Sequence, residues 1–358
     1  MSDRPISPPP VTQSGTDELP AYVSNGLVGL RVLDTPLLPG ICIVSGVSGR
    51  HPEVGIEAAA QAPYPLAGDI QLDGTWLSQT LGHARFVRQS YDFSCGELLT
   101  EFEFRTDGVT ASVEVLTFCS RSEPTIVCQE VTVRTTAQAR VTIRSGIDPD
   151  GIPGQWLNRE TATPGEPEPA VDGALLWDTL GSLSQVGLAY VTEYVGAAPA
   201  QMTRQEWGER QPLRSDYAFN AEPGAAYAVR QLAALVPSTM HAMPDRQATR
   251  LAARARHLGW EQLREANRRL WDELWRGRIR LIGADRNWQE LTDAAFFYLN
   301  SSVHPASPSS TSIFGLAQWK NYHYYYGHVM WDIETFAIPP TPRWSSNDRV
   351  AGIGSVGR

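Results

Sequence analysis

The residues best suited to chemistry lie near the end of the sequence, between Tyr322 and Pro340. Four tyrosines, two histidines, one tryptophan and two acidic residues fall within these nineteen positions. An aromatic ring can cover the apolar C–H patches of a ligand, and a carboxylate can accept hydrogen bonds from its hydroxyl groups. The stretch therefore predicts a site for a neutral, hydroxyl-rich ligand; the alternative is that the aromatic side chains fill a core.

The two carboxylates of this stretch, Asp332 and Glu334, are two positions apart. On a helix this spacing turns their side chains to different sides, and on a strand it places them on one face. Neither arrangement gives the defined separation of about 5–10 Å that an acid and base need across a glycosidic bond. We therefore interpret Asp332 as a ligand-binding carboxylate. In a compatible interpretation, Asp332 or Thr335 caps a helix that ends at Pro339-Pro340.

Patterns for a metal or a nucleotide cofactor are not found in the sequence. His323 and His328 lie five positions apart, with no cysteine or HExxH motif beside them, so we expect no metal site. The glycine-containing segments 24–26 and 46–49 form neither a GxGxxG motif nor a phosphate-binding loop, and no GxSxG elbow occurs. We expect no cofactor, and local motifs assign no catalytic residue.

Composition describes a folded protein with an acidic balance. The 358 residues are 42% hydrophobic and 19% charged, with a formal net charge of −9, and this length predicts two domains. An acidic balance gives no support for binding to nucleic acid or to an anionic membrane. No run of about 18 apolar residues could span a membrane. Residues 1–20 are polar and proline-rich, so we expect a flexible arm and no signal peptide.

Cysteine usage indicates a reducing compartment. The four cysteines, Cys42, Cys95, Cys119 and Cys128, form no CxxC pair, and three of them lie in strand-like segments. Buried thiols are expected rather than a zinc site. We accordingly predict a cytoplasmic protein.

The elements that must position the Tyr322–Pro340 stretch begin with strands. Asn25-Gly26 predicts a tight turn between apolar neighbours. From residue 41 to 236 the hydrophobic period is two, interrupted by Gly, Pro and Asp turns. Residues 21–240 are therefore predicted to form a large antiparallel β-sandwich. Phe102, Phe104 and Phe118 lie in its strands, and the spacing of the first two favours the core.

After Pro244 the pattern becomes helical. Asp245 is a plausible N-cap for a helix towards His257, and residues 260–275 and 288–299 follow as two further helices. Arginines and acidic residues alternate between residues 245 and 280, which we interpret as solvated helix faces. We expect a helical linker over residues 241–283 and the start of a larger helical domain over 284–340.

Two segments resemble glycoside hydrolase family 65. Gly327-His-Val-Met-Trp-Asp-Ile-Glu-Thr-Phe336 resembles the family's Gly-His-x-Phe-Trp-Asp-Thr-Glu segment, and Asn25-Gly-Leu-Val-Gly-Leu-Arg31 resembles its Asn-Gly-x-x-Gly-x-Arg segment. The family contains maltose, trehalose and kojibiose phosphorylases, acid trehalases and protein-glucosylgalactosylhydroxylysine glucosidases. The two motifs occur in the expected order, and the resemblance covers roughly residues 21 to 340.

The resemblance implies a mixed β and α fold, with a supersandwich, a helical linker and then an (α/α) barrel. It also implies inversion at the anomeric carbon, with a glutamate as general acid and water or phosphate as the attacking group. Trp331 and Asp332 correspond to the pair that contacts glucose in the −1 subsite, and His328 and Glu334 are further substrate-binding candidates. Met330 and Ile333 depart from the family's Phe and Thr.

The resemblance also implies that the general-acid glutamate and the phosphate-binding loop lie beyond the end of this sequence. Residues 341–358 are apolar-poor and unlike the family's continuation. We expect an aberrant tail from a frameshift or truncation, and negligible turnover by the chain alone.

The functional prediction is a glycosidase that acts on α-glucosyl disaccharides, with a small carbohydrate as its partner and a homodimer allowed. One alternative is a disaccharide phosphorylase of the same family, with inorganic phosphate as co-substrate. The other is a non-catalytic sandwich that binds carbohydrate or mediates oligomerisation.

Overall fold

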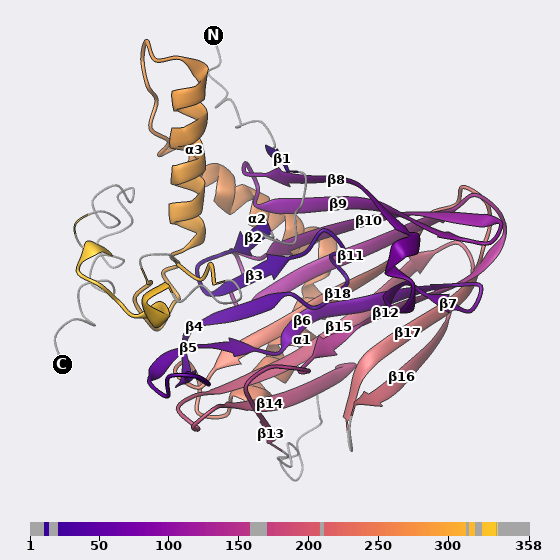
Figure 1. Cartoon of the computed structure of the whole chain (residues 1–358), viewed down its shortest axis with the longest axis horizontal. Coiled ribbons are helices and arrows are strands. Elements are labelled where there is room, and N and C mark those ends of the chain that lie inside the picture. Colours follow the sequence, from indigo (N-terminus) through magenta and orange to yellow (C-terminus); the bar gives the residue numbers. More distant parts are fainter. Residues whose placement is uncertain are drawn as a thin grey trace.

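The computed structural model describes residues 11–13, 21–157, 170–207, 211–312, 315–318, 324–333 and 335. Antiparallel strands dominate, and they form sheets of nine, five and four strands. Three α-helices follow the strands in sequence (Figure 1). Within the described part of the chain, no helix is long and apolar enough to cross a membrane.

The nine-stranded sheet forms the largest layer. In spatial order its strands are β1 (Val11–Gln13), β8 (Ala84–Asp92), β9 (Glu97–Thr106), β10 (Val109–Cys119), β11 (Ile126–Thr135), β18 (Tyr227–Pro237), β15 (Gln185–Gly196), β14 (Gly173–Thr179) and β13 (Gly154–Leu157).

The two smaller sheets lie beside it. The five-stranded sheet runs β16 (Gln201–Trp207), β17 (Gln211–Ala221), β12 (Ala139–Asp148), β6 (Tyr64–Leu72) and β7 (Thr75–Trp76). The four-stranded sheet runs β2 (Ala21–Ser24), β3 (Val28–Val32), β4 (Ile41–Arg50) and β5 (Glu57–Ala62). Two 3₁₀ turns, η1 (Leu77–Gln79) and η2 (Leu81–His83), connect β7 to β8.

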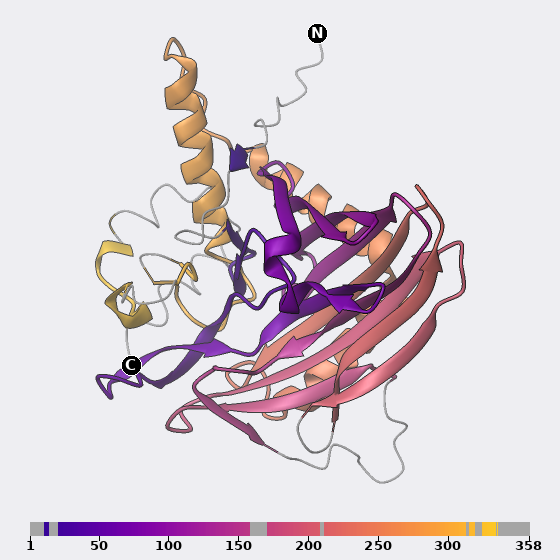
Figure 2. The same cartoon turned by 45° about the vertical axis from the view of Figure 1, so that its right-hand side comes forward.

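The nine- and five-stranded sheets pack face to face as curved layers (Figure 2). Their shared core contains Phe102, Phe104 and Val229 from one sheet and Ile143 and Tyr217 from the other. Alternate residues on each strand face this core because side chains on a strand have a period of two. The predicted antiparallel sandwich and the core position of Phe102 and Phe104 are thus confirmed.

Three helices complete the chain: α1 (Pro244–Leu258), α2 (Trp260–Trp275) and α3 (Arg286–Ser301). Helix α1 covers the other face of the nine-stranded sheet, where Ala248 and Ala252 pack against Val191 and Leu232. Alanines allow the helix to approach the sheet closely, since they carry no long side chain. Helix α3 projects away from the sheets (Figures 1 and 2).

Two local predictions were wrong. Asp245 is not the N-cap of α1: Met243 is, with Pro244 at the first helical position, which suits proline because an N–H there would have no helical partner. Val11–Gln13, inside the expected flexible arm, pairs with β8 as β1.

The arginines after residue 245 are not simply solvated. Arg264 and Arg268 both bond the carboxylate of Glu97 on β9, with N–O distances of 2.7 and 2.6 Å. Arg278 forms a bidentate pair with Asp293 of α3 at 2.6 Å. Helical periodicity could not reveal these partners, because they lie on other elements.

Candidate functional site

The Asn25–Arg31 motif forms the β2–β3 turn, and its first residue holds four backbone groups. The buried Asn25 side chain accepts hydrogen bonds from the N–H groups of Leu27 and Val28, both at 2.9 Å. Its amide nitrogen donates to the carbonyls of Ser120 and Pro124 at 2.6 and 2.9 Å. Asn25 therefore fixes the turn and joins it to the nine-stranded sheet.

The rest of the motif contacts the segment that leads to Trp331. Gly26 has a φ of +89°, and a Cβ there would collide with the backbone of Val303. A Cβ at Gly29 would collide with Leu316. Arg31 donates to the carbonyls of Ala317 and Gln318 at 2.8 and 3.2 Å. The motif is thus a platform for residues 303–318, a contact that sequence reasoning missed because it spans nearly three hundred positions.

A buried arginine supports the same junction. Arg121 donates to the carbonyl of Asn300 at 2.7 Å, and its guanidinium lies 5.0 Å from the ring centroid of Trp271. Burial lowers the pKa of Arg121 to about 10. Asn300 lies in the last turn of α3, where carbonyl groups lack helical partners and favour a cation. Arg121 thereby links the sandwich to the end of α3.

The predicted site segment itself lies against the β4–β5 hairpin. His328 and the carbonyl of Glu57 form a hydrogen bond of 2.9 Å through Nε2. The Tyr326 ring meets the His51 ring edge-on, with centroids 5.4 Å apart. Tyr326 belongs to η3 (Tyr324–Gly327), where it has a positive φ, a conformation that neighbouring contacts must stabilise in a non-glycine residue. No sequence signal pointed to His51.

The four predicted ligand-binding residues differ in how accessible the structure makes them to a ligand. Trp331 is 67% exposed, and Asp332 is half-buried next to it. His328 is exposed, with its Nε2 occupied by Glu57, whereas Glu334 lies outside the described residues. Ile333 is buried, so an apolar residue suits the position where the family pattern has a threonine.

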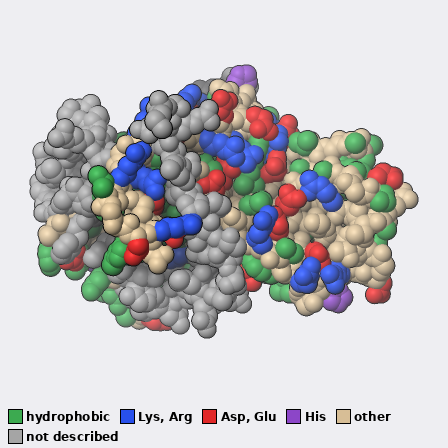
Figure 3. Space-filling model, turned by 90° about the horizontal axis from the view of Figure 1, so that it is seen from above, with side chains coloured by type: hydrophobic (Ala, Val, Ile, Leu, Met, Phe, Trp, Pro, Cys, Tyr) green, Lys and Arg blue, Asp and Glu red, His purple; other side chains and the backbone are tan. Residues whose placement is uncertain are grey.

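Metal and thiol chemistry find no support in the parts of the chain that the structure describes. There, no group of three or more His, Cys, Asp or Glu side chains could hold a metal ion. Burial raises the pKa of the thiols of Cys42, Cys95, Cys119 and Cys128, so they remain protonated and unreactive. Acidic and basic side chains are intermixed on the described part of the face in Figure 3.

Comparisons with known proteins give the family and the fold. The model for the N-terminal domain of glycosyl hydrolase family 65 matches residues 12–274. A solved structure assigned as a kojibiose phosphorylase from human microbiome is 12% identical with a TM-score of 0.68, and the match covers 92% of this chain and 45% of that one.

Other likenesses are weaker. A bacterial glucoamylase bound to acarbose is 8% identical, with a TM-score of 0.38 and coverages of 82% and 43%. No curated protein matches the sequence. At 12% identity the phosphorylase likeness shows the fold, and this chain spans less than half of that protein's length.

Because the family model covers most of the sequence, including the Asn25–Arg31 motif, the predicted family is confirmed: the chain belongs to glycosyl hydrolase family 65, a family of carbohydrate-active enzymes, and carries its N-terminal domain.

Proposed function

We propose that this chain binds the non-reducing glucosyl unit of an α-linked disaccharide, as part of a glycosidase that inverts the anomeric carbon. The observation that carries the proposal is that the sandwich contacts the chain at and before the second motif. His328 of that motif is hydrogen-bonded to the carbonyl of Glu57 at 2.9 Å. Arg31 and Gly29 of the first motif contact residues 316–318, which precede the second motif in the sequence. The sandwich thus acts as a scaffold for Trp331 and Asp332.

The chemistry of these two residues suits a sugar. An indole that is 67% exposed offers an apolar face on which the C–H groups of a pyranose ring can stack. The carboxylate of Asp332 can accept hydrogen bonds from sugar hydroxyls. The hydrogen bond between His328 and the carbonyl of Glu57 fixes the position of the imidazole ring. We include Glu334 as the fourth contact on the basis of the family motif.

The helices fit the proposed architecture. We propose that α1 and α2 are the linker and that α3 begins the (α/α) barrel. Apolar side chains on and before α3 are exposed: Ile282 is 100% exposed, Trp288 60% and Leu291 61%. A helix with exposed apolar residues gains stability from packing against further helices, as in a barrel.

Phosphorolysis is the second candidate, because the phosphorylase above has the same fold. The two reactions differ only in whether water or inorganic phosphate attacks the anomeric carbon. By the family resemblance, we expect the general acid and the phosphate-binding loop outside the residues that the structure describes.

Product analysis tests the proposal. The longest translation product of the gene would be incubated with kojibiose, maltose or trehalose, with and without inorganic phosphate, and the products followed by proton NMR. Inversion converts the non-reducing glucosyl unit into β-glucose when water attacks and into β-glucose 1-phosphate when phosphate attacks, whereas the leaving glucose unit keeps its own anomeric configuration, which is α in trehalose. Release of the non-reducing glucosyl unit as its α-anomer, seen as a lack of any initial excess of the β-anomer, or no cleavage of any of the three disaccharides, would contradict the proposal.

A further inference from the structure

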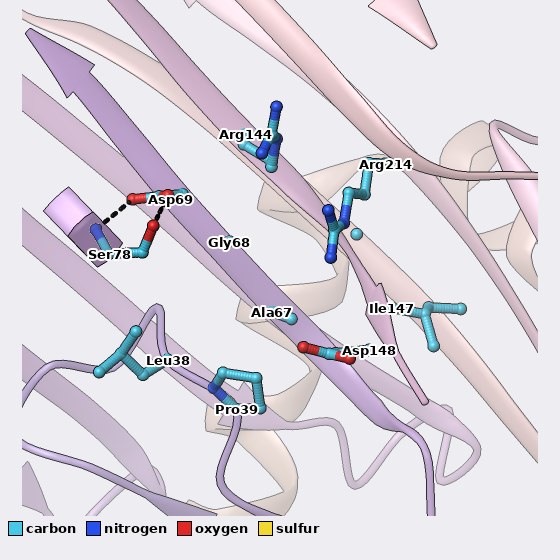
Figure 4. A pocket seen from close by; sticks show the side chains of 11 residues that line it. Leu38, Pro39, Ala67, Gly68, Asp69, Ser78, Arg144, Ile147, Asp148 and Arg214 are labelled. Atoms are coloured by element: carbon cyan, nitrogen blue, oxygen red, sulfur yellow. Dashed lines mark hydrogen bonds between the residues drawn. The ribbon is translucent and has the colours of Figure 1, made fainter. Parts of the chain in front are cut away.

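A hollow lies on the five-stranded sheet, and it shares no residue with the Trp331 segment. Strands β6, β12 and β17 form its floor, and Leu38 and Pro39 stand over one side (Figure 4). The register explains the depression: Ala67 pairs with Gly146, and Gly146 pairs with Arg214 on the outward face. Two small residues in one row leave space between larger neighbours.

Charged side chains at one end of the hollow are already held in place. The two carboxylate oxygens of Asp69 accept hydrogen bonds from the Ser78 N–H at 3.1 Å and hydroxyl at 2.5 Å. Arg144 forms a bidentate pair with Asp216 at 2.8 and 2.9 Å, and its guanidinium lies 4.2 Å from the ring centroid of Trp76. Such fixed groups cost little conformational entropy when a ligand binds.

The other end of the hollow is formed by Arg214 and Asp148, which are both half-buried. Burial, with the nearby charge of Arg144 as a smaller cause, lowers the pKa of Arg214. Burial also raises the pKa of Asp148, which already accepts a hydrogen bond from the N–H of Asp150 at 2.9 Å. Both charged groups have lost part of their hydration, so hydroxyl groups of a ligand would stabilise them.

The charge balance selects the ligand class. The two arginines are balanced by three carboxylates, those of Asp69, Asp148 and Asp216, so an anion gains no net attraction, and the two guanidinium groups that line the hollow disfavour a small cation. Hydrogen-bond donors on the two arginines and acceptors on Asp69 and Asp148 both line the hollow, as a polyhydroxyl ligand requires. Leu38 and Pro39 offer an apolar edge for its C–H groups. The cavity volume of about 160 Å³ is below the roughly 300–1,000 Å³ of pockets for larger ligands, which limits the occupant to one sugar unit.

We infer that the sandwich carries a second carbohydrate site in this hollow, which binds one neutral sugar unit between Asp69–Ser78 and Arg214–Asp148. It does not depend on the proposed catalytic function, because the Trp331 segment contributes no group to it. Its role would be to hold a sugar chain or a free monosaccharide on the scaffold, away from the bond to be cleaved.

Calorimetric titration of the purified chain with D-glucose and with maltose tests the inference. Ala67→Leu fills the hollow without changing charge, and Arg214→Gln removes a donor; each is expected to weaken binding at this site at least tenfold. Trp331→Ala should leave that binding unchanged. Arg204→Gln is the matched control, since Arg204 pairs with Asp172 outside the hollow. Thermal unfolding of every variant checks that the fold is retained.

Three results would overturn the inference. The first is sugar binding that neither Ala67→Leu nor Arg214→Gln weakens in folded protein. The second is saturable binding of inorganic phosphate that Arg214→Gln abolishes while both sugars give no heat, because it would make the hollow an anion site. The third concerns Trp331. Loss of all sugar binding in Trp331→Ala alone would contradict the second site and leave the proposed function standing.

Discussion

At the scale of single residues, buried polar side chains link segments that are far apart in the sequence. Asn25 holds four backbone groups, and Arg121 reaches the end of α3. Both bond mainly to backbone atoms, so they fix the course of the chain and not a particular side chain. A buried polar group that loses its partner costs more than the net value of the hydrogen bond. Substitutions there should therefore be severe.

Asn25→Ala is expected to lower the free energy of unfolding by about 3 kcal/mol or more, because it leaves buried donors and acceptors without partners. Urea unfolding at neutral pH measures the change. Asn220→Ala is the control, since Asn220 is exposed on β17 and its loss should cost under about 0.5 kcal/mol. Equal effects of the two substitutions would refute this account of Asn25.

At the scale of elements, α2 is attached to β9 by charge as well as by apolar packing. Burial alone would raise the pKa of Glu97, but hydrogen bonds from Arg268 and Arg264 outweigh it and hold the pKa below its usual value. The ionised pair therefore stabilises the fold at neutral pH. That contribution disappears as the pH falls through the folded-state pKa of Glu97, because a group with a lowered pKa binds fewer protons when folded.

Glu97→Gln should destabilise the protein at neutral pH by about 2 kcal/mol, less than the roughly 3–5 kcal/mol for a fully buried pair, because Arg268 stays half-exposed. The difference from wild type should shrink as the pH is lowered. Glu114→Gln breaks an exposed pair with Arg134 and should cost under about 1 kcal/mol. A Glu97→Gln effect that does not change with pH would contradict the assigned role.

The elements also show what the sequence could predict. The hydrophobic period of two over residues 41–236 located the strand-rich part of the chain, and α2 begins and ends at the predicted residues. Local patterns carry that information. The order of strands in the sheets, the partners of Arg264 and Arg268, and the contact between Asn25–Arg31 and residues 303–318 were not predictable. They depend on which distant segments meet, and no local pattern encodes that.

At the scale of the whole molecule, the sandwich and helix α3 differ in how completely they bury their apolar side chains. The described sheets bury large apolar clusters, whereas Trp288 and Leu291 of α3 remain exposed. Exposed apolar patches of this kind favour association with other surfaces. The purified chain is therefore expected to self-associate through α3.

Replacing Trp288 and Leu291 together by glutamine should raise the solubility of the chain and leave its free energy of unfolding within about 0.5 kcal/mol, because exposed side chains contribute little to the fold. Light scattering and urea unfolding measure the two quantities. Phe297→Gln, on the buried side of α3, should instead destabilise the protein strongly. A double variant that unfolds readily would show that both residues are packed in solution.

The most direct test of the account is disaccharide binding by Trp331. Calorimetry would compare Ala67→Leu, in which the second site is blocked, with Ala67→Leu/Trp331→Ala, using kojibiose, maltose and trehalose. We predict binding of at least one disaccharide by the first and affinity at least about tenfold weaker for the second, since tenfold corresponds to about 1.4 kcal/mol of lost stacking. Trp288→Ala in the same background is the control, because Trp288 is comparably exposed on α3. Equal affinities with and without Trp331 would contradict the claim that the sandwich positions this segment to hold a glucosyl unit.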